Sequence, residues 1–308
     1  MFGSSRVYTG IEIGPGRARM ARVCKEKRGW RLLHCKEVPF PDGVLEPSYK
    51  KENVADPEGF ISVIRELIKG IKGLSRIGLA LPNESLKVTI HHLETLPKSR
   101  DGMTDFILWK EREELPFPPE QAKVAYSVFS IPTLNGKSLI AAIGSRDIIQ
   151  DYERNLKRLR LTPEVIQPSS INHLNFYLPH IPSSGTFAFL GVFEKYFSFL
   201  VFEEGGPIFY RGKRRAPVAV HFLQEIDMNL ELFLNEYPGR EIPILYLQCQ
   251  YLPSRDFITE FRDYFNIKTE IIPEEDIIIL PGGSDEIKGS GDIAPFVSAI
   301  GAAQSLVI

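Results

Sequence analysis

Hydrophobic and polar positions alternate over the first forty residues as they do in short β-strands. Turn-forming residues interrupt the alternation at Gly14-Pro15-Gly16 and again at 25–29, which is the punctuation expected between the strands of a meander. We therefore predict three strands at residues 7–13, 18–24 and 30–38.

The apolar spacing changes to that of a helix after residue 55. Asp56 is a suitable capping residue and Pro57 suits the first helical position, and an apolar stripe follows. The stripe consists of Phe60, Ile61, Ile64, Leu67, Ile68 and Ile71. A buried strand is predicted next, at 76–81.

The same order of elements returns at residue 185. We predict a second meander at 186–193, 196–203 and 207–211, then a helix at 218–237, a strand at 242–247 and a helix capped by Ser254. The turn glycines Gly14 and Gly191 lie 191 − 14 = 177 residues apart. The repetition indicates a duplicated α/β unit with a cleft between the copies.

The segment between the two copies has a different pattern. It predicts a helix at 106–115, strands at 124–129 and 138–143, and a helix that begins at Ser145. Ser169-Ser170 after Pro168 is interpreted as a helix cap. Lys213-Arg214-Arg215 is interpreted as a solvated turn, with a contact to a phosphate or a lipid headgroup as the alternative.

Composition and charge exclude several classes of function. The 308 residues are 43% hydrophobic with a formal net charge of −2, so neither nucleic acid nor a membrane surface is expected as a direct partner. The cysteines, Cys24, Cys35 and Cys249, lack zinc or disulfide spacing, which favours a reducing cytoplasm. The histidines form no metal-binding motif, so no metal is expected. Neither a signal peptide nor an apolar run of ~20 residues is visible.

Several segments, in this order, resemble PilM, the actin-like protein of type IV pilus assembly. GIEIGPGRARMARV at 10–23 is similar to its first phosphate hairpin, and FAFLGVFEKYFSFLVFEEGGPIFYR at 187–211 to its second. FILWKEREELPFPPEQAKVAYSVF at 106–129 resembles the helix with a Trp-Glu pair that runs into an Ile-Pro-Phe-Pro turn. PFVSAIGAAQSL at 295–306 resembles the closing helix.

The resemblance implies an α/β, two-lobed, actin-like fold related to FtsA, of the duplicated RNase H-like type. Its first lobe, subdomain 1A, is expected at 1–92 plus 162–184, with an inserted 1C-type subdomain at 93–161. The second lobe is expected at 185–290, with a reduced subdomain 2B because the chain runs almost directly from Arg215 into the long helix. The C-terminal helix at 291–308 returns to the first lobe.

The first phosphate loop implied by the resemblance is partly intact. Glu12 stands where the family has Asp, and Arg19 stands where PilM has its phosphate-binding Lys. Arg binds phosphate but has a different shape from Lys. Gly14 and Gly16 keep the turn flexible, whereas Pro15 removes one N–H donor.

The two phosphate and adenosine elements of the second lobe depart further. The acidic position before Gly191 is Phe189, which cannot hold a metal's water, and 248–251 replace the glycines that adenosine approaches. We therefore expect no catalysis and no cofactor. The residues of the vestigial nucleotide site are Glu12, Gly14, Gly16, Arg19 and Gly191.

By the resemblance, the expected partner is the cytoplasmic tail of a PilN-like inner-membrane protein. The chain is then cytoplasmic and peripheral at the inner membrane, held there by its partner. An extended tail is expected in a groove between subdomains 1A and 1C. The predicted partner-binding residues are Leu79, Leu81, Pro82, Ile107, Trp109, Arg112, Leu115 and Phe117, for each of which core packing is the alternative.

Two other functions remain open at this stage. The chain is alternatively an active ATPase, PilM-like or sugar-kinase-like, that binds Mg-ATP through Glu12 and Arg19. It is alternatively a cytoplasmic component of type II secretion of the GspL kind, which shares the fold. The absence of a C-terminal membrane helix in this sequence argues against the intact form of GspL.

Overall fold

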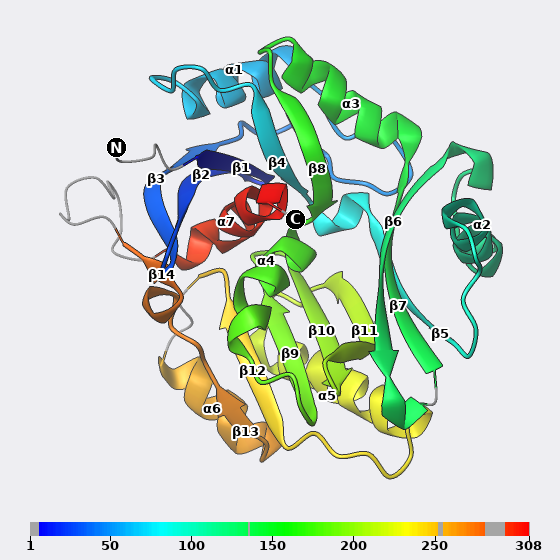
Figure 1. The fold of residues 1–308 in the computed structure, drawn as a ribbon. Coiled ribbons are helices and arrows are strands. Elements are labelled where there is room, and N and C mark those ends of the chain that lie inside the picture. Colours follow the sequence, from blue (N-terminus) through cyan, green and yellow to red (C-terminus); the bar gives the residue numbers. More distant parts are fainter. Residues whose placement is uncertain (1–5, 135, 252–254, 281–292, 308) are drawn as a thin grey trace.

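The fold is built on two large β-sheets, one of six strands and one of five, which lie one above the other in Figure 1. The computed structural model describes residues 6–134, 136–251, 255–280 and 293–307. Its helices are α1 Pro57–Leu67, α2 Arg100–Glu111, α3 Arg146–Lys157, α4 Ser169–Tyr177, α5 Ala219–Glu236, α6 Arg255–Phe265 and α7 Val297–Gln304. Its strands are β1 Val7–Ile13, β2 Arg17–Glu26, β3 Gly29–Pro39, β4 Arg76–Leu81, β5 Lys87–Leu93, β6 Ala122–Ile131, β7 Gly136–Ser145, β8 Thr162–Pro168, β9 Thr186–Val192, β10 Tyr196–Glu203, β11 Gly206–Arg214, β12 Ile244–Cys249, β13 Lys268–Glu270 and β14 Ile278–Ile279.

The topology of the two large sheets confirms the predicted duplication. The first sheet has the order β14-β3-β2-β1-β4-β8 and the second β11-β10-β9-β12-β13. In each, two parallel strands extend an antiparallel meander. In the first sheet β4 pairs with β1 and β8 pairs with β4. In the second sheet β12 pairs with β9 and β13 pairs with β12. The short β14 lies within the range predicted for the second lobe, yet it pairs in parallel with β3 of the first sheet.

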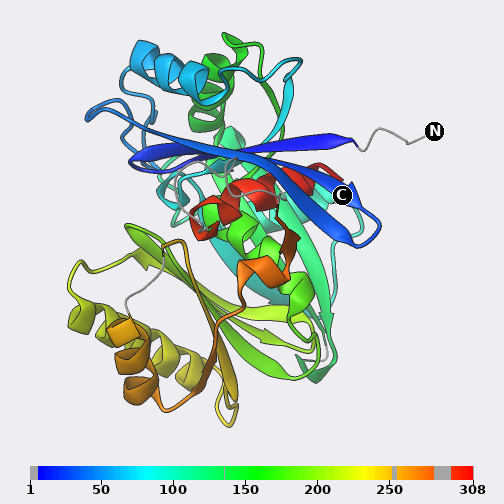
Figure 2. The ribbon, with the colours of Figure 1, turned by 90° about the vertical axis from the view of Figure 1, so that its left-hand side faces the viewer.

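Helices cover both faces of each large sheet. α1 and α3 lie outside the first sheet, α5 and α6 lie outside the second, and α4 and α7 lie between the two sheets (Figure 2). We call the first sheet with its outer helices the first lobe, and the second sheet with its outer helices the second lobe. Each lobe has its own apolar core, and another core built on α4 and α7 joins the lobes.

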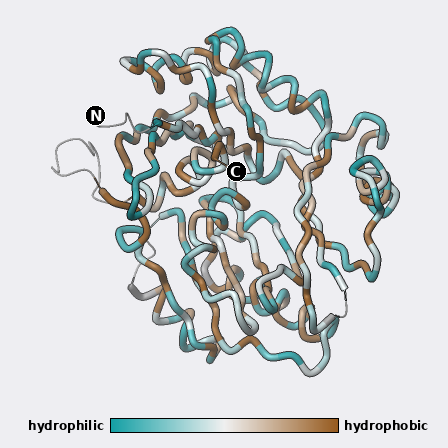
Figure 3. The backbone as a smooth tube through the Cα atoms, viewed as in Figure 1, coloured by the Kyte–Doolittle hydropathy of each residue, from teal (hydrophilic) through white to brown (hydrophobic). Residues whose placement is uncertain are grey.

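The inserted segment forms a small antiparallel sheet of its own, with the order β5-β7-β6. Helix α2 covers one face and buries Met103 and Ile107 against it. The other face approaches β11, where Ser138 donates a hydrogen bond to the carbonyl oxygen of Pro207. In Figure 3, α3 is largely hydrophilic, as expected for a helix on the outside of the molecule.

The helix boundaries follow local capping chemistry. The Asp56 carboxylate accepts hydrogen bonds from the N–H groups of Glu58 and Gly59, and Ser145 caps α3, both as predicted. The prediction that Ser169-Ser170 caps a helix was wrong. The N-cap of α4 is Pro168, and the Ser169 hydroxyl instead donates to the carbonyl oxygen of Leu81.

Helix α2 also differs from its predicted range of 106–115. It begins at Arg100, because Ser99 caps it by accepting a hydrogen bond from the N–H of Gly102, and it ends at Glu111. The predicted cap at Ser254 falls outside the described residues. No helix in the described part of the chain is long and apolar enough to cross a membrane.

Candidate functional site

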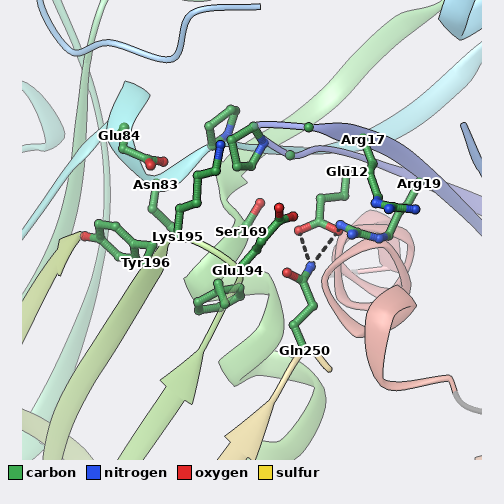
Figure 4. A pocket seen from close by; sticks show the side chains of 15 residues that line it. Glu12, Arg17, Arg19, Asn83, Glu84, Ser169, Glu194, Lys195, Tyr196 and Gln250 are labelled. Atoms are coloured by element: carbon green, nitrogen blue, oxygen red, sulfur yellow. Dashed lines mark hydrogen bonds and ion pairs between the residues drawn. The ribbon is translucent and has the colours of Figure 1, made fainter. Parts of the chain in front are cut away.

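A narrow cleft lies between the two lobes, and the turn between β1 and β2 forms one of its walls. The N–H of Gly14 donates to the carbonyl oxygen of Arg17 over 2.8 Å and closes this turn. The predicted residues Glu12, Gly14, Gly16 and Arg19 all line the cleft. The turn between β9 and β10 forms the opposite wall, together with residues that follow β12 (Figure 4).

A buried ion pair occupies the middle of the cleft. The hairpin register places Arg19 opposite Glu12, and their side chains meet at 3.0 Å between Nη1 and Oε2. Both side chains are only 2% exposed. Gln250 from the second lobe donates its amide N–H groups to both carboxylate oxygens of Glu12, at 2.9 and 3.0 Å.

Arg19 has two further polar neighbours. Nη2 donates to the hydroxyl of Tyr251, and Nε lies 3.3 Å from a carboxylate oxygen of Glu37. Burial alone lowers the pKa of Arg19, but its interactions with Glu12, Tyr251 and Glu37 outweigh burial, so the pKa is raised. Arg19 therefore stays charged at any pH at which the protein folds.

The cleft leaves little open space. The volume that a water-sized sphere can enter is about 20 Å³, which is room for one or two water molecules. Ligand pockets for molecules of drug or cofactor size usually have roughly 300–1,000 Å³. Arg19 and Gln250 are among the residues that line this space, and both donate hydrogen bonds to Glu12.

Phe189 points into the core between the lobes and not into the cleft. It is fully buried on β9, with the rings of His173 and Tyr177 about it. In the family that the sequence resembles, an acidic side chain at this position faces the nucleotide's metal. An apolar ring in this core offers no ligand to a metal.

Three buried polar side chains surround Gly191, below the cleft. Ser198 and Gln248 flank it on the neighbouring strands, and a Cβ added to Gly191 would lie 2.9 Å from the Ser198 hydroxyl and 3.4 Å from Nδ1 of His173. All three are fully buried, and their side-chain polar atoms have no hydrogen-bond partner among the described residues. Burial lowers the pKa of His173 to about 3, so its ring is neutral at ordinary pH.

These residues do not fit a magnesium-bound nucleotide. The carboxylate of Glu12 is already paired with Arg19 and Gln250, and the second lobe supplies Phe189 where an acid is needed. Glu194, on the facing turn, would repel a triphosphate. Within the described residues, no group of three or more His, Cys, Asp or Glu side chains is placed to hold a metal ion.

The structure separates the predicted partner-binding residues into buried and exposed sets. Leu79, Leu81 and Ile107 are core side chains with at most 1% exposure, and Pro82 lines the cleft. Their surfaces are therefore not open to a partner. The accessible members are Trp109, which is 57% exposed, the exposed Arg112, and the half-buried Leu115 and Phe117.

A groove runs between β5 and β11, which are edge strands of the small sheet and of the second sheet. We call it the β5–β11 groove, and its two adjoining parts measure about 430 and 280 Å³. Its lining includes Tyr49, Leu86, Lys87, Val88, Glu111, Glu114, Tyr210 and Arg211. Among the described residues β5 pairs only with β7, and β11 only with β10, so each strand has a free edge.

A carboxylate is fixed in the wall of this groove. Thr89 donates to Oε1 of Glu111 at 2.8 Å, His91 lies 3.0 Å from the same oxygen, and Lys87 pairs with Oε2. Burial raises the pKa of Glu111, but these hydrogen bonds outweigh it and hold the pKa at about 2. Glu111 is therefore ionised at physiological pH.

Sequence patterns had identified the cleft turns but not the contacts between them. Gln250 and Tyr251 were recognised only as replacements for glycines, because their partners, Glu12 and Arg19, are 238 and 232 residues away along the chain. The β5–β11 groove was missed because it joins strands from two different sheets. Neither pairing leaves a local pattern in the sequence.

Together, the repeated sheet topology, the joining core and the cleft define an actin-like fold with two lobes. The structure is similar to that titled "PilM-PilN type IV pilus biogenesis complex", with a TM-score of 0.80, 17% identity and coverage of 98% of both chains. This likeness confirms the fold that the sequence motifs predicted. Neither a protein-family model nor a curated protein sequence matches the chain.

Two further solved structures resemble the chain over nearly its whole length. One is a Bacteroides thetaiotaomicron protein of unknown function with an actin-like ATPase fold, at TM-score 0.53, 11% identity and 96% coverage of both chains. The other is the cytoplasmic domain of EpsL, an inner membrane component of the type II secretion system of Vibrio cholerae. Its TM-score is 0.51 at 10% identity, with 97% of this chain and 95% of that chain covered.

Proposed function

We propose that this chain is a non-catalytic scaffold of the PilM type in a type IV pilus, or related type II secretion, assembly complex at the inner membrane. The observation that supports this most is the likeness to a chain of the PilM–PilN type IV pilus biogenesis complex, over 98% of both chains. The partner is the cytoplasmic tail of a PilN-like membrane protein. The chain is cytoplasmic, and the tail of its partner holds it at the inner membrane.

The β5–β11 groove is the proposed docking site for the tail. An extended peptide binds readily at a free strand edge, because main-chain hydrogen bonds provide affinity and side-chain pockets provide selectivity. The edge is closed near Ile208, whose carbonyl oxygen accepts from the Tyr237 hydroxyl at 2.9 Å. Towards Tyr210 and Arg211 the groove widens, so the tail docks from that end.

The first prediction concerns this groove. Val88 is half-buried on β5 within it, so Val88→Asp places a charge where an apolar contact forms. We expect Val88→Asp to weaken binding of a PilN-like tail peptide at least about tenfold, measured by isothermal titration calorimetry, since losing one buried apolar contact and burying a charge together cost more than about 1.4 kcal/mol.

Two variants locate the binding surface. Val220→Asp is the matched control, because Val220 is 52% exposed on α5, outside the groove, and should leave affinity unchanged. Trp109→Ala tests the exposed face of α2. Loss of binding in Trp109→Ala with full binding in Val88→Asp would move the docking site to α2. No binding of the tail by the unmodified protein would overturn the proposed partner.

The absence of catalysis and of a cofactor is part of the same proposal. It is supported by the paired state of Glu12, by Phe189 in the core and by the small volume of the cleft. The rival function is an active PilM-like ATPase that binds Mg-ATP through Glu12 and Arg19.

A second candidate is a GspL-like component of type II secretion. The likeness to the EpsL cytoplasmic domain favours it over other actin-like functions. Titration with tail peptides from both kinds of system distinguishes the two candidates, because only the cognate tail should bind in the groove.

A further inference from the structure

We propose that Glu12, Arg19, Gln250 and Tyr251 form an interlobe latch, in which side chains of the protein itself hold the two lobes closed across the cleft. In this arrangement the latch takes the bridging place of a nucleotide. The inference rests on the proposed function only in that no nucleotide bridges the lobes.

The first-lobe half of the latch is formed within one hairpin. Glu12 and Arg19 face each other on β1 and β2, and their ion pair does not depend on the second lobe. The pair nevertheless leaves acceptor capacity on Glu12 and donor capacity on Arg19. A carboxylate accepts about four hydrogen bonds and a guanidinium donates five, so closure must supply further partners for both groups.

The second lobe supplies those partners from a fixed position. The N–H of Gln250 donates to the carbonyl oxygen of Val192 over 2.8 Å, which anchors the segment after β12 to the end of β9. Anchored there, Gln250 directs both of its contacts at the Glu12 carboxylate. Hydrogen bonds to an ionised acceptor are roughly twice as strong as neutral ones.

Tyr251 adds a second bridge beside the first. Its hydroxyl accepts from Nη2 of Arg19, and its ring centroid lies 5.5 Å from the guanidinium carbon. The ring therefore contributes a cation–π contact as well as a hydrogen bond. Both bridges run from the second lobe to the same buried ion pair, so both are made only when the lobes are closed.

Buried polar networks of this kind specify one arrangement better than apolar packing does, and this role fits the position of the latch. The joining core of α4 and α7 connects the lobes by apolar packing. The latch is a second connection between the lobes, made by polar side chains in the middle of the cleft. It therefore sets how far the lobes open.

Hydrogen exchange followed by mass spectrometry tests the latch on the full chain. Gln250→Ala combined with Tyr251→Phe removes both bridges and leaves the Glu12–Arg19 pair intact. We expect exchange in the two cleft turns, residues 13–17 and 193–196, to become about tenfold faster, as loss of hydrogen bonds to charged groups implies. Tyr251→Phe alone keeps the ring in place and should show part of this acceleration.

Gln224→Ala combined with Tyr264→Phe is the matched control, because both side chains are exposed on the outer helices α5 and α6. It should leave exchange in both turns unchanged. Unchanged exchange in the latch variants would overturn the inference, as would slower exchange in these turns of the unmodified protein when Mg-ATP is added. Tail binding is measured separately, so failure of the partner proposal leaves the exchange result standing.

Discussion

At the scale of single residues, the turn between β1 and β2 shows how much a local motif can predict. Glu12 and Arg19 lie where the motif predicted them, because both belong to one short hairpin. Their pairing with each other was not predictable from the motif. Gln250 and Tyr251, which come from the other lobe, add hydrogen bonds to this pair.

His173 gives a prediction about stability at low pH. The ordinary pKa of His is about 6.5, whereas burial lowers that of His173 to about 3. Between these values the unfolded chain binds a proton that the folded chain does not. Stability contributed by the neutral ring is therefore complete above pH 6.5 and falls by up to about 1.4 kcal/mol per pH unit below it.

We expect His173→Phe to remove this slope, because a phenyl ring fits among Tyr177, Phe189 and Phe193 and does not titrate. Urea unfolding of both proteins between pH 6 and pH 4 measures the effect. His221→Gln, at an exposed position on α5, is the control and should keep the slope of the unmodified protein. Parallel curves for the unmodified protein and His173→Phe would contradict the expectation.

At the scale of elements, strands and helices with strong local patterns were predicted well, whereas strands that form through long-range pairing were predicted poorly. The strand at 76–81 and the helix that begins at Pro57 were found because apolar spacing and a cap agree. Strand β8 was missed, because its second residue is Pro163, its last is Pro168, and only Val165 and Ile166 between them are apolar. It forms through parallel pairing with β4, which no local pattern reveals.

The contact between β4 and α7 provides an element-scale prediction. A Cβ added to Gly78 would lie 1.8 Å from the carbonyl oxygen of Ala302, a backbone atom that cannot move aside alone. We expect Gly78→Ala to force α7 off the sheet and lower the free energy of unfolding by about 3 kcal/mol or more. Chemical denaturation measures this change.

Gly16→Ala is the control for Gly78→Ala. An added Cβ at Gly16 would meet nothing within 4 Å, and its backbone does not adopt positive φ. The free energy of unfolding of Gly16→Ala should therefore stay within about 0.5 kcal/mol of that of the unmodified protein. Equal effects of the two substitutions would mean that the approach of α7 to β4 is looser than the structure has it.

At the scale of the whole molecule, duplication was predictable and the contacts between the copies were not. Two meanders 177 residues apart implied two lobes and a cleft, and the sheet orders confirm the duplication. The cleft contents depend on how the lobes meet, through the joining core and the interlobe latch. The apolar pattern of one segment does not show which distant segment it will contact.

Closure of the cleft leads to a last prediction, which separates the scaffold from the ATPase. A nucleotide would need to displace Gln250 and Tyr251 from the Glu12–Arg19 pair, and would then find Phe189 buried where a metal-binding acid is required. We expect calorimetric titration with Mg-ATP to show no micromolar binding. Glu12→Ala should show the same null result. Micromolar binding that disappears in Glu12→Ala would establish a working nucleotide site, whereas tail binding without nucleotide binding is the pattern of a scaffold whose lobes are held together by its own side chains.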